Sequence, residues 1–363
     1  NVSVMNAANL CPSSLPALEA MYENTKDVDG NPSFQNRAKM GEGKVNTRKI
    51  LADYLHTTPE QIVITRNTSE GNNLVSSGVE LTANDEVIIF NHNHPSNNVA
   101  WKEKAKRFGF TVTELEVINP HPGPDYYIDL VRRSITARTK LLSFTHHTNT
   151  VGDLFPAKEL CQVAHERDIL VLVDGAQSFG LMDVDLSDMQ PDFYTGSAHK
   201  WPCGPKETGV LFINNRAHDK IWPSIHSAGR GDVGISRTFE SFGQRDEPAI
   251  IAFGEGLKFQ QQIGMKTIQA RSQELAQSLM EQLKTIEGVT LTTSQDPTLS
   301  QAVVVFEVTG IDARKLYNAL YDNEKIGTAG RANGLRISPH FYNLHSEIDR
   351  TVAAIKHYMT TGV

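Results

Sequence analysis

Two segments of this chain end in residue types that together can carry out Schiff-base chemistry. An apolar run at 169–173 leads into Asp174, and a polar run ends in Ser197, His199 and Lys200. A desolvated lysine amine can condense with an aldehyde, and a carboxylate can keep a pyridine nitrogen protonated. Pyridoxal 5′-phosphate needs both groups, so the sequence predicts a site for this cofactor, with Lys200 forming the aldimine.

Thr68 and Ser69 follow the β-branched run 62–65 and open a segment with helical periodicity. Hydroxyl residues cap helices, and the free N–H groups of a first helical turn bind anions. We expect Thr68 or Ser69 to cap this helix and to help hold the cofactor phosphate. An ordinary cap without a ligand is the alternative.

His94 and Asn149 each follow a predicted strand, at 87–90 and 141–144. The carboxyl ends of parallel strands meet at one edge of a sheet, where α/β proteins bind their ligands. An imidazole there can stack on a flat cofactor ring, and an asparagine amide can donate to a phenolate oxygen. An asparagine that only stabilises its own turn is the alternative for Asn149.

Histidines also raise the possibility of a metal site, and hence of a metal-dependent hydrolase as a distant alternative. The candidate ligands are His92, His94, His146, His147 and Asp174. Adjacent residues of an extended chain point in opposite directions, and no carboxylate joins these histidines in a metalloenzyme motif. We therefore predict no metal site.

Arg336 lies in a β-like segment near the C-terminal end and could bind a substrate carboxylate through two parallel hydrogen bonds. A structural ion pair is the alternative. Arg37, Arg230 and Arg331 are further candidates for binding a polar or acidic substrate side chain, although each would more commonly be a surface charge.

These residues can meet in one site if a parallel sheet positions them. The pattern of the sequence between 62 and 213 predicts such a sheet. Short β-branched runs alternate with amphipathic stretches, including helices at 96–106 and 157–167, as in βαβ units. The fold class is therefore α/β, with helices covering both faces of the sheet. We predict strands at 62–65, 87–90, 111–115, 141–144, 169–173 and 210–213.

Beyond a Gly-rich passage at 227–234 the pattern changes to long helical periodicity, at 248–288. A small α+β unit then follows, with predicted strands at 289–292, 302–307 and 335–338 and helices at 312–321 and 346–359. We predict a large cofactor domain at 10–255 and a small domain formed by 1–9 and 256–363.

The 363 residues carry a net charge of −7, from 35 Lys and Arg against 42 Asp and Glu, and the basic residues are scattered. This pattern indicates a small-molecule partner and neither nucleic acid nor a membrane. Three cysteines without metal-ligand spacing suggest free thiols and a reducing compartment. We expect a cytoplasmic protein by default, or a periplasmic one if a leader has been removed before Asn1.

The segments Val-Asp-Gly-Ala-Gln at 173–177 and Ser-Ala-His-Lys at 197–200 resemble the class V aminotransferase family of fold type I pyridoxal phosphate enzymes. The resemblance covers nearly the whole chain. It implies an aspartate aminotransferase-like fold, with a three-layer α/β/α large domain around a mostly parallel seven-stranded sheet and a small C-terminal α+β domain. It also implies a homodimer.

The same resemblance implies a role for each candidate residue. Lys200 would carry the aldimine, Asp174 would face the pyridine nitrogen and His94 would stack on the ring. The phenolic oxygen would lie near Gln177 and Asn149, and Thr68, Ser69, Ser197 and His199 would hold the phosphate. Arg336, together with Asn6, would bind the substrate carboxylate.

Within the family, the segments at 199–205 and 336–343 are similar to the isopenicillin N epimerase-like branch more than to the cysteine desulfurases. The loop at 326–334 contains no cysteine, which argues against thiol-mediated persulfide transfer, and Cys203 is expected to be a small buried thiol. Gln244 stands where relatives usually have a threonine that reaches the phosphate of a neighbouring subunit.

The predicted function is a reaction at the Cα of an amino acid or of an amino-acid-containing, peptide-like substrate. Lys200, once freed from the cofactor, would be the base at Cα. Reprotonation at Cα gives epimerisation, reprotonation at the cofactor carbon gives transamination, and loss of a β-substituent gives a carbon–sulfur lyase, which we keep as the alternative. A silent binding scaffold is disfavoured because Lys200 and Asp174 are both present.

Overall fold

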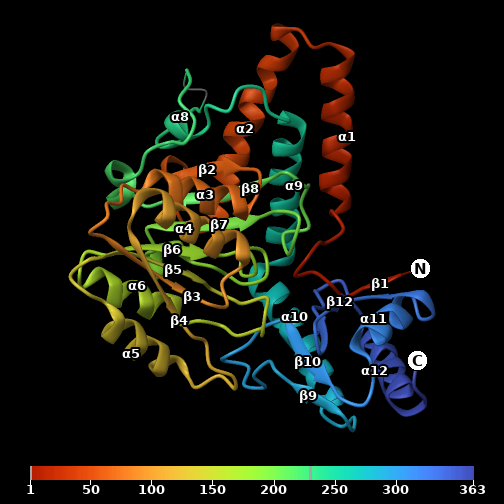
Figure 1. Ribbon diagram of the computed structural model, residues 1–363. Coiled ribbons are helices and arrows are strands. Elements are labelled where there is room, and N and C mark those ends of the chain that lie inside the picture. Colours follow the sequence, from red (N-terminus) through yellow and green to blue (C-terminus); the bar gives the residue numbers. More distant parts are fainter. Residues whose placement is uncertain (1, 229–230) are drawn as a thin grey trace.

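The computed structural model describes residues 2–228 and 231–363, and it is built around a central seven-stranded sheet (Figure 1). The strands from β7 to β4 in this order run parallel, and β8 runs antiparallel to both of its neighbours. The spatial order is β2 (Ile62–Thr65), β8 (Gly209–Ile213), β7 (Phe193–Ser197), β6 (Leu170–Asp174), β5 (Thr139–Thr145), β3 (Glu86–Phe90) and β4 (Thr111–Leu115).

Helices cover both faces of this sheet, because its inner strands are apolar on both sides. One core contains Leu74 of α3 (Thr68–Gly78) and Trp101 of α4 (Pro95–Phe108). The opposite core contains side chains from five helices. These are α2 (Phe34–Tyr54), α5 (Pro124–Ser134), α6 (Ala157–His165), α7 (Leu186–Met189) and α9 (Glu247–Ile263). The mostly parallel α/β sheet predicted from the sequence is confirmed.

An antiparallel pair of helices, α1 (Leu15–Gly30) and α2, packs along α9 and projects from the large sheet (Figure 1). The sequence analysis did not assign this pair. A short helix, α8 (Ser236–Phe239), is held nearby, because Arg48 of α2 forms ion pairs with Asp232 and Glu240 on either side of it.

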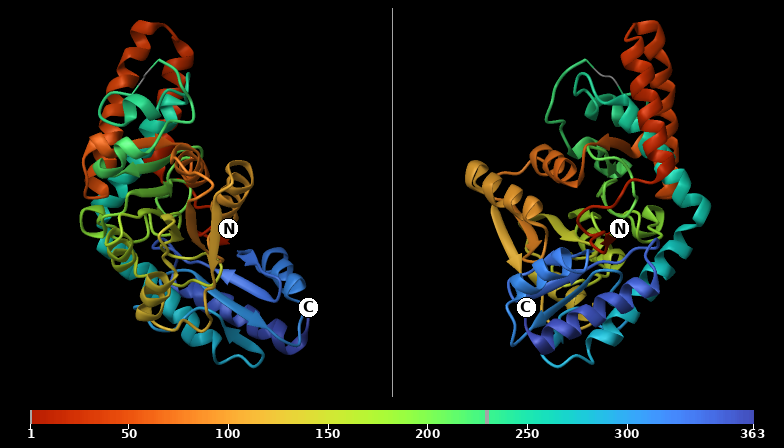
Figure 2. Two further views of the ribbon diagram at one scale, coloured as in Figure 1. Left: turned by 60° about the vertical axis from the view of Figure 1, so that its left-hand side comes forward. Right: turned by 90° about the vertical axis from the view of Figure 1, so that its right-hand side faces the viewer.

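The C-terminal unit has its own antiparallel sheet, in the order β12 (Ala329–Gly330), β13 (Gly334–Ile337), β10 (Val304–Val308) and β9 (Val289–Leu291). Its core packs against α10 (Met265–Leu283), α11 (Ala313–Asp322) and α12 (His345–Thr361). Both views in Figure 2 show this unit at one end of the molecule and the α1–α2 pair at the other.

The N-terminal arm joins the C-terminal unit through β1 (Ser3–Val4), which pairs in parallel with β11 (Ile326–Gly327). The division into a large domain at 10–255 and a small domain formed by 1–9 and 256–363 stays a prediction. No helix of the described residues is long and apolar enough to cross a membrane.

All six predicted strands of the large sheet are present, five of them within one residue at each end, and β5 begins two residues before the predicted start at 141. β7 was not among the predicted strands, although Lys200 follows it after Ala198 and His199. The stretch of helical periodicity at 248–288 contains two helices, because Gly264 lies between α9 and α10 with φ +92°, which no right-handed helix accommodates.

Candidate active site

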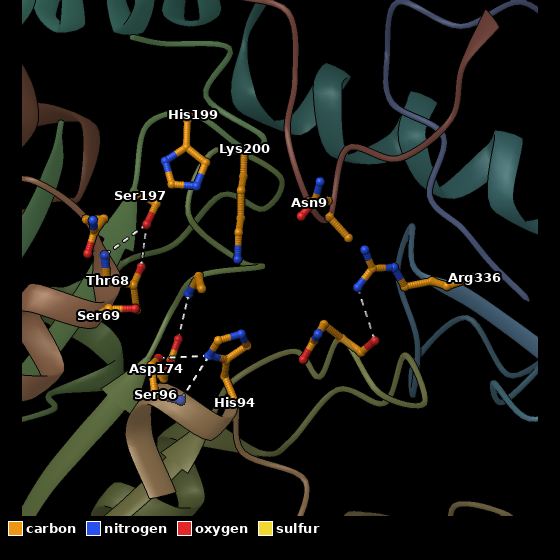
Figure 3. A pocket seen from close by; sticks show the side chains of 14 residues that line it. Asn9, Thr68, Ser69, His94, Ser96, Asp174, Ser197, His199, Lys200 and Arg336 are labelled. Atoms are coloured by element: carbon orange, nitrogen blue, oxygen red, sulfur yellow. Dashed lines mark hydrogen bonds between the residues drawn. The ribbon is translucent and has the colours of Figure 1, made fainter. Parts of the chain in front are cut away.

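A pocket lies at the carboxyl ends of β6 and β7 and brings together most of the residues predicted from the sequence (Figure 3). Asn6 and Gln177 are not among its lining residues. Five lining residues that the sequence analysis did not propose are Ala8, Asn9, Asn67, Ser96 and Ala176. The predicted residues that line the pocket are Thr68, Ser69, His94, Asn149, Asp174, Ser197, His199, Lys200 and Arg336.

Asp174 ends β6 and is 1% exposed. Its Oδ1 accepts a hydrogen bond from the backbone N–H of Ala176 at 3.0 Å, and its Oδ2 accepts one from the side-chain amide of Asn72 at 2.8 Å. Hydrogen bonds to a carboxylate favour its ionised form and fix its orientation. Asp174 therefore presents an ordered carboxylate to the pocket.

Lys200 follows β7 and extends into the same pocket, where Figure 3 shows its amine between Asp174 and Arg336. Burial lowers the pKa of Lys200 to about 8, the Asp174 carboxylate opposes this effect, and the Arg336 guanidinium adds to it. A lysine with a pKa near 8 has a substantial fraction of free amine at neutral pH, which is the form that attacks a carbonyl.

The predicted phosphate cradle forms at the start of α3, with one correction. The helix cap is Asn67, whose side chain accepts from the backbone N–H of Glu70 at 3.0 Å, and Thr68 is the first helical residue. Asparagine caps as well as threonine or serine does, so the hydroxyl residues were not the only candidates. Because Asn67 is the cap, Thr68 and Ser69 lie in the first turn, where backbone N–H groups face an anion.

Ser197 lies opposite this helix start. Its Oγ accepts from the backbone N–H of Thr68 at 2.8 Å and lies 2.8 Å from the Thr68 hydroxyl. Nearby, burial first and then Lys200 and Lys206 lower the pKa of His199 to about 4. The cradle is thus made of hydroxyls, a helix N-terminus and a neutral imidazole.

His94 caps α4, and its ring faces the pocket (Figure 3). The backbone N–H of Ser96 donates to His94 Nδ1 at 3.2 Å, which leaves the ring proton on Nε2. Burial first and then Lys200 lower the pKa of His94. The ring is therefore neutral at neutral pH and can pack on a flat cofactor without adding charge.

Arg336 in β13 has its guanidinium at the opposite side of the pocket and is 5% exposed. It donates to the Asn6 side-chain oxygen at 2.9 Å and to the Asn149 backbone oxygen at 3.4 Å, and its Nε is buried without a partner. No acidic side chain of the described residues pairs with it. Burial and then Arg331 hold the pKa of Arg336 well below its usual value.

This environment argues against the structural ion pair, because a buried guanidinium that has only neutral partners retains capacity for an anion. Asn6 lies behind Arg336 and orients it, and Asn149 contributes its backbone oxygen.

Gln177 lies behind the pocket wall and is 2% exposed. Its amide nitrogen donates to the Ala8 backbone oxygen at 3.0 Å, and its amide oxygen accepts from the Trp201 indole at 2.8 Å. Gln177 thus ties the N-terminal arm to the segment that carries Lys200, and its predicted place near a phenolic oxygen stays a prediction.

The other candidate arginines differ in environment. Arg37 pairs with Glu247 at 3.1 Å, away from the pocket, and Arg230 lies outside the described residues. Arg331 is partly buried and donates to the Asn149 backbone oxygen at 2.5 Å, so the surface-charge interpretation of Arg331 is wrong. Gln244 lines a separate pocket, with Arg66 and Glu70.

The histidines proposed for a hydrolase do not form a ligand cluster with Asp174. Within residues 2–228 and 231–363, the one trio of metal-ligand residue types close enough to share an ion is Cys11, Cys203 and His340. Both ring nitrogens of His340 are engaged, because Nε2 lies 2.7 Å from the Trp201 backbone oxygen and Nδ1 lies 3.0 Å from the Ser272 hydroxyl. The trio therefore packs as a buried polar cluster.

The donor set of the main pocket fits pyridoxal phosphate. Asp174 offers an ordered carboxylate for a pyridine nitrogen, and Lys200 offers an amine with a lowered pKa for an aldehyde. The helix N-terminus of α3 and the hydroxyls of Thr68 and Ser197 offer a positive end and donors for a phosphate, while the Thr68 N–H itself donates to Ser197. A hydrolase site would not need this combination of amine, carboxylate and anion cradle.

Comparisons with known proteins agree with this geometry. The family model for aminotransferase class-V matches residues 6–351. An isopenicillin N epimerase of Amycolatopsis lactamdurans is 29% identical, over 98% of this chain and 94% of its own length. One of Streptomyces clavuligerus is 30% identical, over 85% of this chain and 82% of its own length. A probable cysteine desulfurase of Methanothermobacter thermautotrophicus is 26% identical, over 99% of this chain and 90% of its own length.

Among solved structures, the cystine C–S lyase C-DES in complex with its reaction product cysteine persulfide has a TM-score of 0.92 at 22% identity. The alignment covers 98% of this chain and 97% of that structure. At that identity the likeness shows the fold alone. The family match spans nearly the whole sequence, and this chain accordingly belongs to the class V aminotransferases, a family of pyridoxal phosphate-dependent enzymes of fold type I.

Proposed function

We propose that this protein acts at the Cα of an amino acid or of a larger substrate that contains an amino acid. The proposed reaction is an epimerisation or a transamination. The observation that carries the proposal is the placement of Arg336 and Lys200 in one pocket. A guanidinium without an acidic partner can hold a carboxylate, and an amine faces the same space. Lys200 is thus placed to act on the carbon that bears the carboxylate.

Pyridoxal phosphate, when bound, supplies an electron sink for the bond that breaks at Cα. The residues of this chain divide the remaining tasks. Arg336 would bind and orient the substrate carboxylate, and Asp174 would keep the pyridine nitrogen protonated. The ring of His94 would pack against the cofactor, and the first turn of α3 with Ser197 would bind the phosphate.

Lys200 is the proton carrier. Its lowered pKa makes the amine available as a base at neutral pH, and its position in the pocket lets it remove a proton from Cα and return one. In the described residues no second base of comparable placement faces the pocket from the Arg336 side, which favours a mechanism with one lysine. Whether the proton returns to Cα or to the cofactor decides between epimerisation and transamination.

A carbon–sulfur lyase is the second candidate. It is supported by the similarity in fold to the cystine C–S lyase C-DES and by the absence of cysteine from the segment 326–334. Cys11, Cys161 and Cys203 are all buried, so none offers an accessible thiol for persulfide transfer. β-Elimination needs no such thiol, whereas a cysteine desulfurase does.

We also propose a homodimer, as the family resemblance implies, and a small-molecule substrate without nucleic acid or membrane partners. A cytoplasmic location stays our default expectation.

The function is tested by proton NMR of the cofactor-loaded protein in heavy water with a panel of amino acids that includes alanine, glutamate, cysteine and cystine. Exchange at Cα with loss of chirality identifies an epimerase, a 2-oxo acid identifies a transaminase, and pyruvate with ammonia identifies a lyase. The Lys200→Ala variant should show none of these products. Turnover that persists in this variant would overturn the assignment of Lys200.

A further inference from the structure

Asn72 is a buried side chain of α3 that lies outside the pocket and touches its central carboxylate. It is fully buried, and its amide nitrogen donates to Asp174 Oδ2 at 2.8 Å. The other end of the same amide accepts a hydrogen bond from the Thr195 hydroxyl at 2.9 Å. Thr195 is also fully buried, so water does not replace either contact.

The direction of these hydrogen bonds is fixed by the groups that form them. An ionised carboxylate only accepts hydrogen bonds, so the NH₂ end of Asn72 must face Asp174 and the oxygen end must face Thr195. The Thr195 hydroxyl then has to donate. The three side chains form a chain of donors that runs from Thr195 through Asn72 to Asp174.

The fold places Thr195 where it can do this. β6 and β7 are parallel neighbours in which Asp174 and Thr195 are register partners, so both side chains lie on the same face of the sheet. α3 approaches this face closely at Gly71, where an added Cβ would lie 2.7 Å from Thr195 Cγ2. A glycine at this position brings Asn72 within reach of both strands.

We infer that Asn72 and Thr195 are positioning residues that hold the Asp174 carboxylate aimed at the place where the pyridine nitrogen of the cofactor would bind. This inference rests on the proposed function. It adds that the charge on the pyridine ring of the bound cofactor depends on the Thr195 hydroxyl and the Asn72 amide, which touch neither cofactor nor substrate.

The test uses the cofactor-loaded protein and two isosteric substitutions. Asn72→Leu removes the donor to Asp174, and Thr195→Val removes the donor that orients the amide. Loss of either donor makes the carboxylate a stronger competitor for the pyridine proton. Less positive charge on the ring then raises the apparent pKa of the chromophore that Lys200 forms with the cofactor. A charge-assisted hydrogen bond is large enough to move this pKa by about one unit and to weaken cofactor affinity by about tenfold.

The measurement is a pH titration of the visible absorbance, together with the dissociation constant of the cofactor. Thr195→Ser keeps the hydroxyl and should retain the wild-type titration. Ser77→Val, on the exposed side of the same helix, is the control. The inference is overturned if both Asn72→Leu and Thr195→Val titrate like this control, even if their unfolding temperatures fall.

If Asn72→Leu does not fold, the comparison of Thr195→Val with Thr195→Ser decides the point alone. A wild-type protein that binds no cofactor would refute the proposed function and this inference together. A wild-type protein that titrates normally, with variants that match the control, would refute only the inference.

Discussion

Arg331 and Arg336 donate to the same backbone oxygen, that of Asn149, at 2.5 and 3.4 Å. The two arginines lie on one face of the β12–β13 hairpin, because Arg336 pairs with Ala329, and Arg331, two residues after Ala329, continues the pairing by donating its backbone N–H to the Gly334 oxygen at 2.8 Å. Two guanidiniums that share one neutral acceptor repel each other. An anion bound beside them relieves this repulsion, so Arg336, which lines the pocket, and its neighbour Arg331 together favour an anion on this side of the pocket.

We predict that Arg331→Gln weakens the binding of a monocarboxylic amino acid by about three- to tenfold, because it removes part of the positive potential at Arg336. Arg336→Gln should weaken it by about a hundredfold, because it removes the direct ligand. The measurement is a spectral titration of the cofactor-loaded protein with the amino acid. Arg314→Gln, on an exposed part of α11, is the control, and equal affinity in Arg331→Gln and this control would contradict the prediction.

Lys200 should give the stability of the apoprotein a pH dependence. Its pKa is about 8 in the folded protein and about 10.4 in an unfolded chain, so between these values the unfolded chain binds more protons. The free energy of unfolding should therefore rise with pH across this window, by about 2 kcal/mol more in the wild type than in Lys200→Met. Urea unfolding of both proteins at pH 8, 9 and 10 measures the difference. Parallel pH profiles would show that Lys200 is not held in a desolvated state.

Gly71→Ala should separate α3 from β7. The new Cβ would lie 2.7 Å from Thr195 Cγ2, and relief of such a contact costs about 1–3 kcal/mol in stability. Because α3 carries the phosphate cradle, cofactor affinity should fall as well. Gly41→Ala is the matched control, because Gly41 lies in α2 with open space around it. There the substitution should stabilise the protein by up to about 1 kcal/mol. Loss of cofactor affinity in both variants would contradict the packing argument.

Arg48 should be a large contributor to the stability of the segment 232–240. It is 1% exposed and pairs with Glu240 at 2.6 Å and Asp232 at 2.6 Å. Arg48→Met leaves these carboxylates without their partner and should lower the free energy of unfolding by about 3–5 kcal/mol. Arg132→Met, which breaks an exposed pair with Glu166, should cost less than about 1 kcal/mol. Similar urea midpoints for the two variants would disprove the prediction.

The residues that sequence reasoning found are those that follow strands. Asp174 and Lys200 end strong apolar or polar runs, and parallel strands carry such ends to one edge of the sheet, so their proximity follows from local pattern. No comparable sequence pattern indicated a role for Asn72. A polar residue inside a helix usually faces solvent, and only the tight contact between Gly71 and Thr195 turns Asn72 inward.

Contacts between segments that are far apart in the sequence also could not be predicted from local sequence patterns. Asn9 and Ala8 line the pocket because β1 pairs with β11, more than 300 residues away along the chain. Arg331 was interpreted as a surface charge, since nothing local shows that its hairpin turns toward Asn149. The α1–α2 pair was not assigned, because several of its large apolar side chains, among them Leu15, Tyr22 and Phe34, are exposed and leave no regular apolar stripe in the sequence.

The hydrogen bond between Asn6 and Arg336 has a consequence for how the protein is made. These residues are 330 positions apart, yet one orients the other. A ribosome adds about 5–20 residues per second, so Arg336 is synthesised at least about 15 seconds after Asn6. The large sheet can assemble during that time, but the carboxylate-binding wall cannot. The residues that would hold the cofactor, up to Lys200, are thus synthesised before the arginine that would bind the substrate carboxylate.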